Sequence, residues 1–156
     1  MVYLGIMVTD QGIPLVDPYN SAFFGELAAR YLLSKGHRNL AFIGPEAIGN
    51  GVTMHRLQGF CSYLREAGIQ LPSEHIINLT GQNMEDILKM LKKAPHPVTG
   101  IFTTADNCAF EIYGAAHRLG YRIPEDFSVI GFDDNSMSRR AIPPLTTIRQ
   151  DICQKA

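Results

Sequence analysis

The sequence predicts an α/β fold, a doubly wound parallel sheet with helices on both faces. Short apolar runs alternate with longer segments in which apolar residues recur at helical spacing, and this alternation continues through the 156 residues. Parallel strands need crossover connections, which helices supply, so the alternation favours a parallel sheet over an antiparallel one. A chain of this length is the size of one domain with its own core.

The predicted elements follow one another in a regular order. VYLGIMV (residues 2–8) predicts a strand, and a helix is expected to begin at Asn20 or Ser21 and to end at Gly36. The remaining predictions are a strand over Leu40–Gly44, a helix before Gly68, a strand over His75–Leu79, a helix from Asn83, a strand TGIFTT, a helix over Asn107–Leu119 and a strand FSVIGF.

Polar residues follow several of these strands directly. They lie in the Pro45–Met54 loop, in Thr104–Asp106 and in Phe132–Asp134. In doubly wound sheets ligands bind outside the carboxyl ends of the strands. The sequence therefore predicts a functional edge made by these three segments.

Composition limits the classes of function. The formal net charge is −1 and the basic residues are scattered, so this chain offers no positive stripe for nucleic acid. Cys61, Cys108 and Cys153 are odd in number and far apart, which favours a reducing, cytoplasmic compartment over a disulfide framework or a zinc site. No apolar run approaches the roughly 20 residues that span a bilayer, so no membrane partner is expected.

Nucleotide-binding motifs are incomplete. Gly44–Gly49 matches half of a phosphate loop, but Asn50 and Gly51 stand where the lysine and the hydroxyl residue belong. The dinucleotide pattern has Met54 in place of its third glycine. A phosphoryl-accepting receiver domain would carry its acidic pair after the first strand, whereas here the pair follows the fifth predicted strand. No cofactor is expected.

Catalytic and metal sites are also poorly supported. No G-x-S-x-G motif is present, and the five histidines are dispersed without ligand spacing. Asp133 and Asp134 are adjacent at a strand end and should point in opposite directions, so they are not expected to share a cation. One of them should face the crevice while the other caps or forms salt bridges.

The sequence leaves two alternative roles open for each of Arg56 and Asp106. Arg56 lies in the first turns of a helix, where its guanidinium either reaches the crevice or stays solvated on the helix face. Asp106 either caps the helix that it begins or contributes to the crevice.

Four segments together resemble one family. YLLSKGHRNLAFIG, RLQGF, GYRIPEDFSVIGFDD and IPPLTTIRQD are similar, in this order, to the effector-binding domain of LacI/GalR-type bacterial transcription regulators, and the resemblance extends over about Asp17–Asp151. It implies a two-lobed module like the type I periplasmic binding proteins, which senses a sugar or a nucleobase-like molecule between its lobes and acts allosterically on DNA binding.

The resemblance also implies site residues. Arg56 matches the arginine that grips ligand hydroxyls or ring heteroatoms, and Asp133 matches the carboxylate that accepts ligand hydrogen bonds. The other candidate effector-binding residues are Asn50, Phe132, Asp106 and Gln150. Ala105 departs from members with asparagine before the aspartate, which puts a typical sugar pose in doubt.

The resemblance further implies a division of the chain. Residues 1–19 are expected to be a remnant of the N-terminal lobe, residues 20–147 the C-terminal lobe, and residues 148–156 the crossover back. The helix-turn-helix that binds operator DNA is absent from this chain, which is interpreted as a fragment of a repressor that forms a homodimer. The alternative is a periplasmic sugar-binding protein of a transport system, which the unpaired cysteines disfavour.

Overall fold

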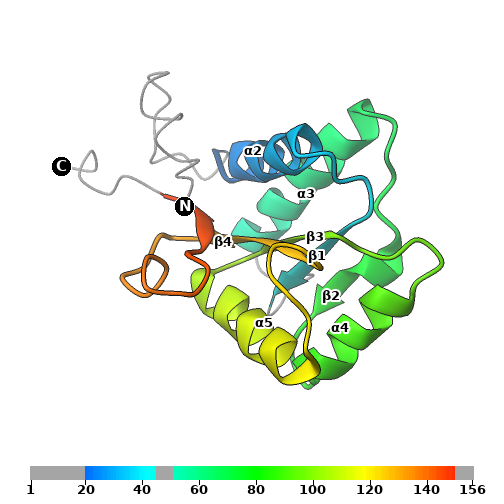
Figure 1. Ribbon diagram of the computed structural model, residues 1–156. Coiled ribbons are helices and arrows are strands. Elements are labelled where there is room, and N and C mark those ends of the chain that lie inside the picture. Colours follow the sequence, from blue (N-terminus) through cyan, green and yellow to red (C-terminus); the bar gives the residue numbers. More distant parts are fainter. Residues whose placement is uncertain (1–19, 45–50, 150–156) are drawn as a thin grey trace.

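The structure, a computed structural model, describes residues 20–44 and 51–149, and its centre is one parallel sheet (Figure 1). The strands are β1 (Leu40–Gly44), β2 (Ile76–Asn78), β3 (Gly100–Thr103), β4 (Ser128–Phe132) and β5 (Thr146–Ile148). The helices are α2 (Asn20–Ser34), α3 (Gly51–Glu66), α4 (Met84–Lys93) and α5 (Asp106–Leu119), with a 3-10 turn η1 at Ser73–His75. The strand order is β2-β1-β3-β4-β5, and all neighbours are parallel. The predicted fold class is confirmed.

Helices cover both faces of this sheet, with α2 and α3 on one side and α4 and α5 on the other (Figure 1). Successive strand residues point to opposite faces, so Phe42 packs beneath α2 and α3 whereas Ala41 and Ile43 pack against α4 and α5. On the first face, the rings of Phe60 and Phe102 lie 5.3 Å apart between centroids. Burial on both faces explains why the strands read as continuous apolar runs.

Two glycines let α2 and α3 approach each other closely. A Cβ atom on Gly59 would lie 1.8 Å from the carbonyl oxygen of Ala22, and one on Gly25 would lie 1.9 Å from that of Arg56. Any larger residue at either position would push the helices apart. This contact fixes the backbone of α3 at Arg56, and with it the origin of the Arg56 side chain.

The structure differs from the predicted strands at the start of β2 and at β5. The strand predicted over residues 2–8 lies outside the described residues. β2 begins at Ile76, one residue later than predicted, because the preceding residues form the turn η1. The fifth strand of the sheet is Thr146–Ile148, which was not predicted as a strand, and Ile148 had been assigned to the crossover. A three-residue strand is too short to show a period of two.

Candidate functional site

The carboxyl ends of β3, β4 and β5 bring the candidate residues to one edge of the sheet. Thr104 directly follows β3, Asp133 directly follows β4, and Ile148 ends β5 beside them in register with Phe132. Arg56 reaches the same edge from the second turn of α3. The structure therefore brings Arg56, Phe132 and Asp133 together, as the sequence predicts.

Arg56 is held in place by two contacts. Its Nη1 donates a hydrogen bond of 2.9 Å to the carbonyl oxygen of Thr104, and its Cζ lies 3.5 Å from the centroid of the Phe132 ring. Burial lowers the pKa of the guanidinium, and the charge of Asp133 opposes that shift. The alternative of a solvated arginine on a helix face is wrong.

One nitrogen of this guanidinium has no partner among the described residues. The Nε atom is buried, and no atom of residues 20–44 or 51–149 accepts a hydrogen bond from it. Buried donors are almost always paired, so an unpaired one beside an open edge suits an acceptor that comes from outside the described residues.

Phe132 supports the arginine rather than facing solvent. Its side chain is fully buried, and its ring makes an edge-on contact with Phe24 of α2, with 5.3 Å between centroids. An aromatic face under a guanidinium provides a cation–π contact, which is strongest where water is excluded.

Asp133 lies in an unusual backbone conformation at the end of β4. Its φ angle is +106°, and its amide donates to the carbonyl oxygen of Ile148 at 2.9 Å, which continues the β4–β5 ladder. The side chain is exposed on the open edge. Surrounding protein removes part of its hydration and raises the pKa of the carboxyl, and the charge of Arg56 opposes this rise. The charges of Arg56 and Asp133 therefore stabilise each other, since each one opposes the pKa shift that burial causes in the other group.

Asp134 has internal partners. Its side chain is only 4% exposed and forms ion pairs with Arg139 at 3.6 Å and with Arg149 at 3.8 Å. It also accepts a hydrogen bond of 3.0 Å from the Ser138 hydroxyl. The prediction that one acid of the pair forms salt bridges is confirmed for Asp134.

Asp106 is the most buried of the three acids at this edge, at 1% exposure. Oδ1 accepts a hydrogen bond of 2.6 Å from the Thr147 hydroxyl, and Oδ2 accepts one of 2.7 Å from the amide of Asn135. Burial raises the pKa of this carboxyl, although the two hydrogen bonds oppose the shift. Of the two alternatives for Asp106, the capping role is wrong, because Ala105 occupies the N-cap position of α5. Both oxygens of Asp106 already have partners within the protein. Direct effector contact by Asp106 stays a prediction.

Asn50 and Gln150 lie outside the described residues. The sequence places Thr104 on the predicted functional edge, but sequence reasoning missed Asn135 and Thr147, which bind Asp106. The only available signal was the P-P-L-T-T segment, in which the second threonine is Thr147.

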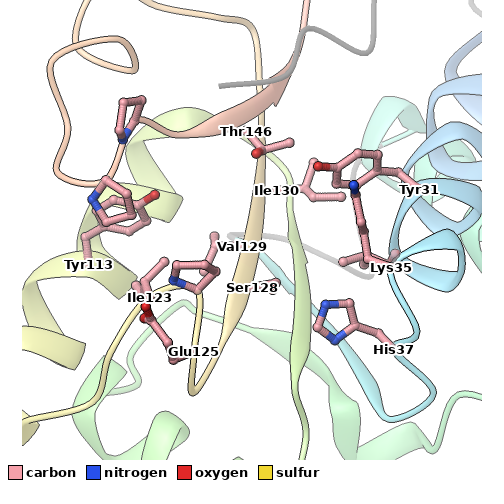
Figure 2. A pocket seen from close by; sticks show the side chains of 14 residues that line it. Tyr31, Lys35, His37, Tyr113, Ile123, Glu125, Ser128, Val129, Ile130 and Thr146 are labelled. Carbon is pink, nitrogen blue, oxygen red and sulfur yellow. The ribbon is translucent and has the colours of Figure 1, made fainter.

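A pocket of about 410 Å³ lies at the opposite end of the strands (Figure 2). Ser128 and Thr146, the first residues of β4 and β5, line it, and Tyr31 and Lys35 face Tyr113 across it. Neither Arg56 nor Asp133 belongs to this pocket. The predicted site is instead an open edge in the described part of the chain.

Within residues 20–44 and 51–149, no three His, Cys, Asp or Glu side chains lie together in a way that could hold a metal ion. No helix in the same ranges has the length and apolar character needed to cross a bilayer.

In open parallel α/β sheets ligands bind outside the carboxyl ends of the strands, which is where this chain holds Arg56 and Asp133. Residues 29–156 match the family model described as the periplasmic binding protein-like domain. The chain therefore belongs to this family, and the predicted LacI-type effector-binding domain is confirmed.

Individual relatives agree with this assignment. The HTH-type transcriptional repressor CytR of Escherichia coli is 35% identical over 126 residues, which cover 79% of this chain and 36% of that protein. The HTH-type transcriptional repressor PurR of Mannheimia succiniciproducens is 34% identical over 155 residues, which cover 95% and 46%. The crystal structure of a LacI-type regulator from Bacillus cereus subsp. cytotoxis superposes with a TM-score of 0.78 at 31% identity, covering 86% of this chain and 48% of that one.

These relatives are transcription regulators, which favours the repressor interpretation over the transport protein. The chain spans less than half the length of these curated relatives. The predicted division at residues 19 and 147 stays a prediction.

Proposed function

We propose that this chain is the effector-sensing part of a bacterial transcription regulator of the repressor type, and that its effector is a small polar molecule such as a sugar or a nucleobase-like metabolite. The observation that supports this most is the immobilised guanidinium of Arg56 beside the exposed carboxylate of Asp133. Such a pair offers donors and an acceptor to one neutral polar ligand, and charge-assisted hydrogen bonds are about twice as strong as neutral ones.

The mechanism that suits this site is allosteric and not enzymatic. A second lobe outside this sequence would close over the edge formed by Arg56 and Asp133, and closure would shift the balance between two arrangements of the whole protein. In this proposal a helix-turn-helix domain of the whole regulator would then bind or release operator DNA. The net charge of −1 is consistent with a chain that does not hold DNA itself.

Cytoplasmic location and a homodimer are parts of the same proposal. DNA-binding repressors act where the DNA is, and the chain's near relatives are repressors. Two large apolar side chains, Met137 at 55% and Ile142 at 93% exposure, lie on the loop between β4 and β5. In the proposed homodimer, the second copy of the chain would cover these two side chains.

The experiment is a binding screen on the gene product that carries this chain. Pentoses, hexoses, nucleosides and purine bases are tested by thermal shift, and compounds that raise the melting temperature are titrated by calorimetry and in a DNA gel-shift assay. The proposal predicts saturable binding of one compound that changes affinity for operator DNA. Binding without any effect on DNA, together with an export signal upstream of this chain, would support the transport protein instead.

A further inference from the structure

We propose that Asp106 and Thr147 are positioning residues for the effector site, because together they hold the turn that presents Asp133 beside Arg56. The role given to Asp133 rests on the proposed function, whereas the turn is a property of the chain alone. Neither residue needs to touch an effector for this purpose.

The turn has a backbone that L-amino acids rarely adopt. Asp133 has a φ angle of +106° and Asp134 one of +53°, and no other described residue except glycine has a positive φ. Two such residues in succession cost free energy, so interactions around them must stabilise the conformation.

Three consecutive backbone amides of the turn are bound by β5 and α5. The Asp133 amide donates to the Ile148 carbonyl at 2.9 Å, and the Asp134 amide donates to the Thr147 hydroxyl at 3.3 Å. The Asn135 amide donates to Asp106 Oδ2 at 2.7 Å. The Thr147 hydroxyl in turn donates a hydrogen bond of 2.6 Å to Asp106 Oδ1, so two of the three anchors share one buried network.

Gly131 of β4 provides the space in which the Asp106 carboxylate lies. A Cβ atom on Gly131 would lie 2.2 Å from Asp106 Oδ1, so glycine in β4 is what lets the carboxylate pass. A buried carboxylate is costly unless donors satisfy it. Here the donors come from the turn and from β5, which are the two segments that must be joined to fix Asp133.

Thr147→Val and Thr147→Ser test this role as a matched pair. Valine keeps the shape of threonine and removes the hydroxyl, whereas serine keeps the hydroxyl. Two quantities are measured by NMR on the unliganded protein: the amide hydrogen exchange of Asp134 and Asn135, with Phe102 in β3 as the reference, and the pKa of Asp133 from a carboxyl titration.

In Thr147→Val we expect the Asp134 and Asn135 amides to exchange about tenfold faster, as the loss of a hydrogen bond to a charged network gives. The pKa of Asp133 should fall toward its ordinary value, because the carboxylate leaves its partly dehydrated place. Thr147→Ser should restore both quantities. Phe102 should change little in either variant.

Two results would overturn the inference. One is an unchanged pKa of Asp133 with unchanged turn amides in Thr147→Val. The other is faster exchange that is equal at Phe102 and at the turn, which would make Thr147 a general stabiliser of the fold. Neither readout uses an effector, so a failed ligand screen would weaken the proposed function and leave this test intact.

Discussion

The guanidinium carbon of Arg56 lies 3.5 Å from the centre of the Phe132 ring, and the same guanidinium donates to the Thr104 carbonyl at 2.9 Å. The side chain is thereby fixed from two strands before any ligand arrives. Preorganised groups lose less entropy on binding, which raises affinity without adding contacts. The stacked arginine therefore links the packing of the sheet to ligand recognition at its edge.

Arg56→Lys tests the contact of the guanidinium with the Phe132 ring and the role of its planar set of N–H donors. Lysine keeps the charge but cannot lie on the ring as a plane or offer a fork of donors. We expect effector affinity to fall by at least about tenfold and the free energy of unfolding to fall by about 1 kcal/mol. Calorimetry and chemical denaturation measure the two effects.

The control is Arg65→Lys, in the last turn of the same helix, where the side chain is exposed. That variant should match the wild type in both measurements. Equal losses in both variants would show that the position of Arg56 has no special role.

Asp134→Asn should lower stability with a smaller effect on affinity. The carboxylate is nearly buried and serves Ser138, Arg139 and Arg149. Losing two ion pairs, whose arginines are about half exposed, and weakening the hydrogen bond from Ser138, which asparagine can still accept, should cost about 1–2 kcal/mol of unfolding free energy. Glu66→Gln, an exposed acid at the end of α3, is the control in denaturant titrations. A tenfold loss of affinity with unchanged stability would instead place Asp134 in direct contact with the effector.

Gly59→Ala should destabilise the chain strongly. The added methyl would meet the Ala22 carbonyl at 1.8 Å, so α2 and α3 must separate, at a cost of about 1–3 kcal/mol or more. The matched change is Gly114→Ala in α5, where the nearest atom is the flexible end of Arg118 at 3.3 Å. There alanine should be neutral or stabilising by up to about 1 kcal/mol. Similar melting temperatures for the two variants would contradict the close helix contact.

The acidic edge also predicts a pH dependence. The pKa of Asp133 is raised in the folded chain, so the folded state holds its proton more tightly than the unfolded state does. Stability from this group is complete below the unfolded value of about 3.9 and is lost as pH rises through the folded pKa. Relative to Asp133→Asn, the wild type should therefore lose unfolding free energy as pH rises above about 4. A difference that grows in the opposite direction would mean that the pKa is lowered.

Much of the fold could be predicted because each element carries its own local signal. Apolar runs in the sequence indicated β1, β3 and β4. An N-cap residue indicated the start of α4, where the Asn83 side chain accepts hydrogen bonds from the backbone amides of Glu85 and Asp86. β5 escaped prediction because three residues show no period, and only pairing with β4 makes them a strand.

The charged residues of the site could be predicted from the sequence, but the hydrogen bonds that hold the turn after β4 could not. Strand ends and the family resemblance pointed to Arg56 and Asp133. The bond from Thr147 to Asp106 joins residues 41 positions apart, and no local pattern encodes it. Likewise, the positive φ angles of Asp133 and Asp134 depend on tertiary contacts, because aspartate by itself favours ordinary backbone conformations.

The most direct test of the account is a double-mutant cycle of Arg56→Ala and Asp133→Asn in the gene product that carries this chain. The effector is titrated by calorimetry, with melting temperature and operator affinity measured beside it. Each single change should weaken effector binding by roughly ten- to a hundredfold, about 1.5–3 kcal/mol, while operator binding stays close to wild type. Stability should stay close to wild type in Asp133→Asn and fall by at least about 1 kcal/mol in Arg56→Ala, which loses the contacts with Phe132 and Thr104. Because both residues grip one ligand, the double variant should lose less than the sum. Unchanged effector binding in both single variants, with stability lost in both, would contradict the account.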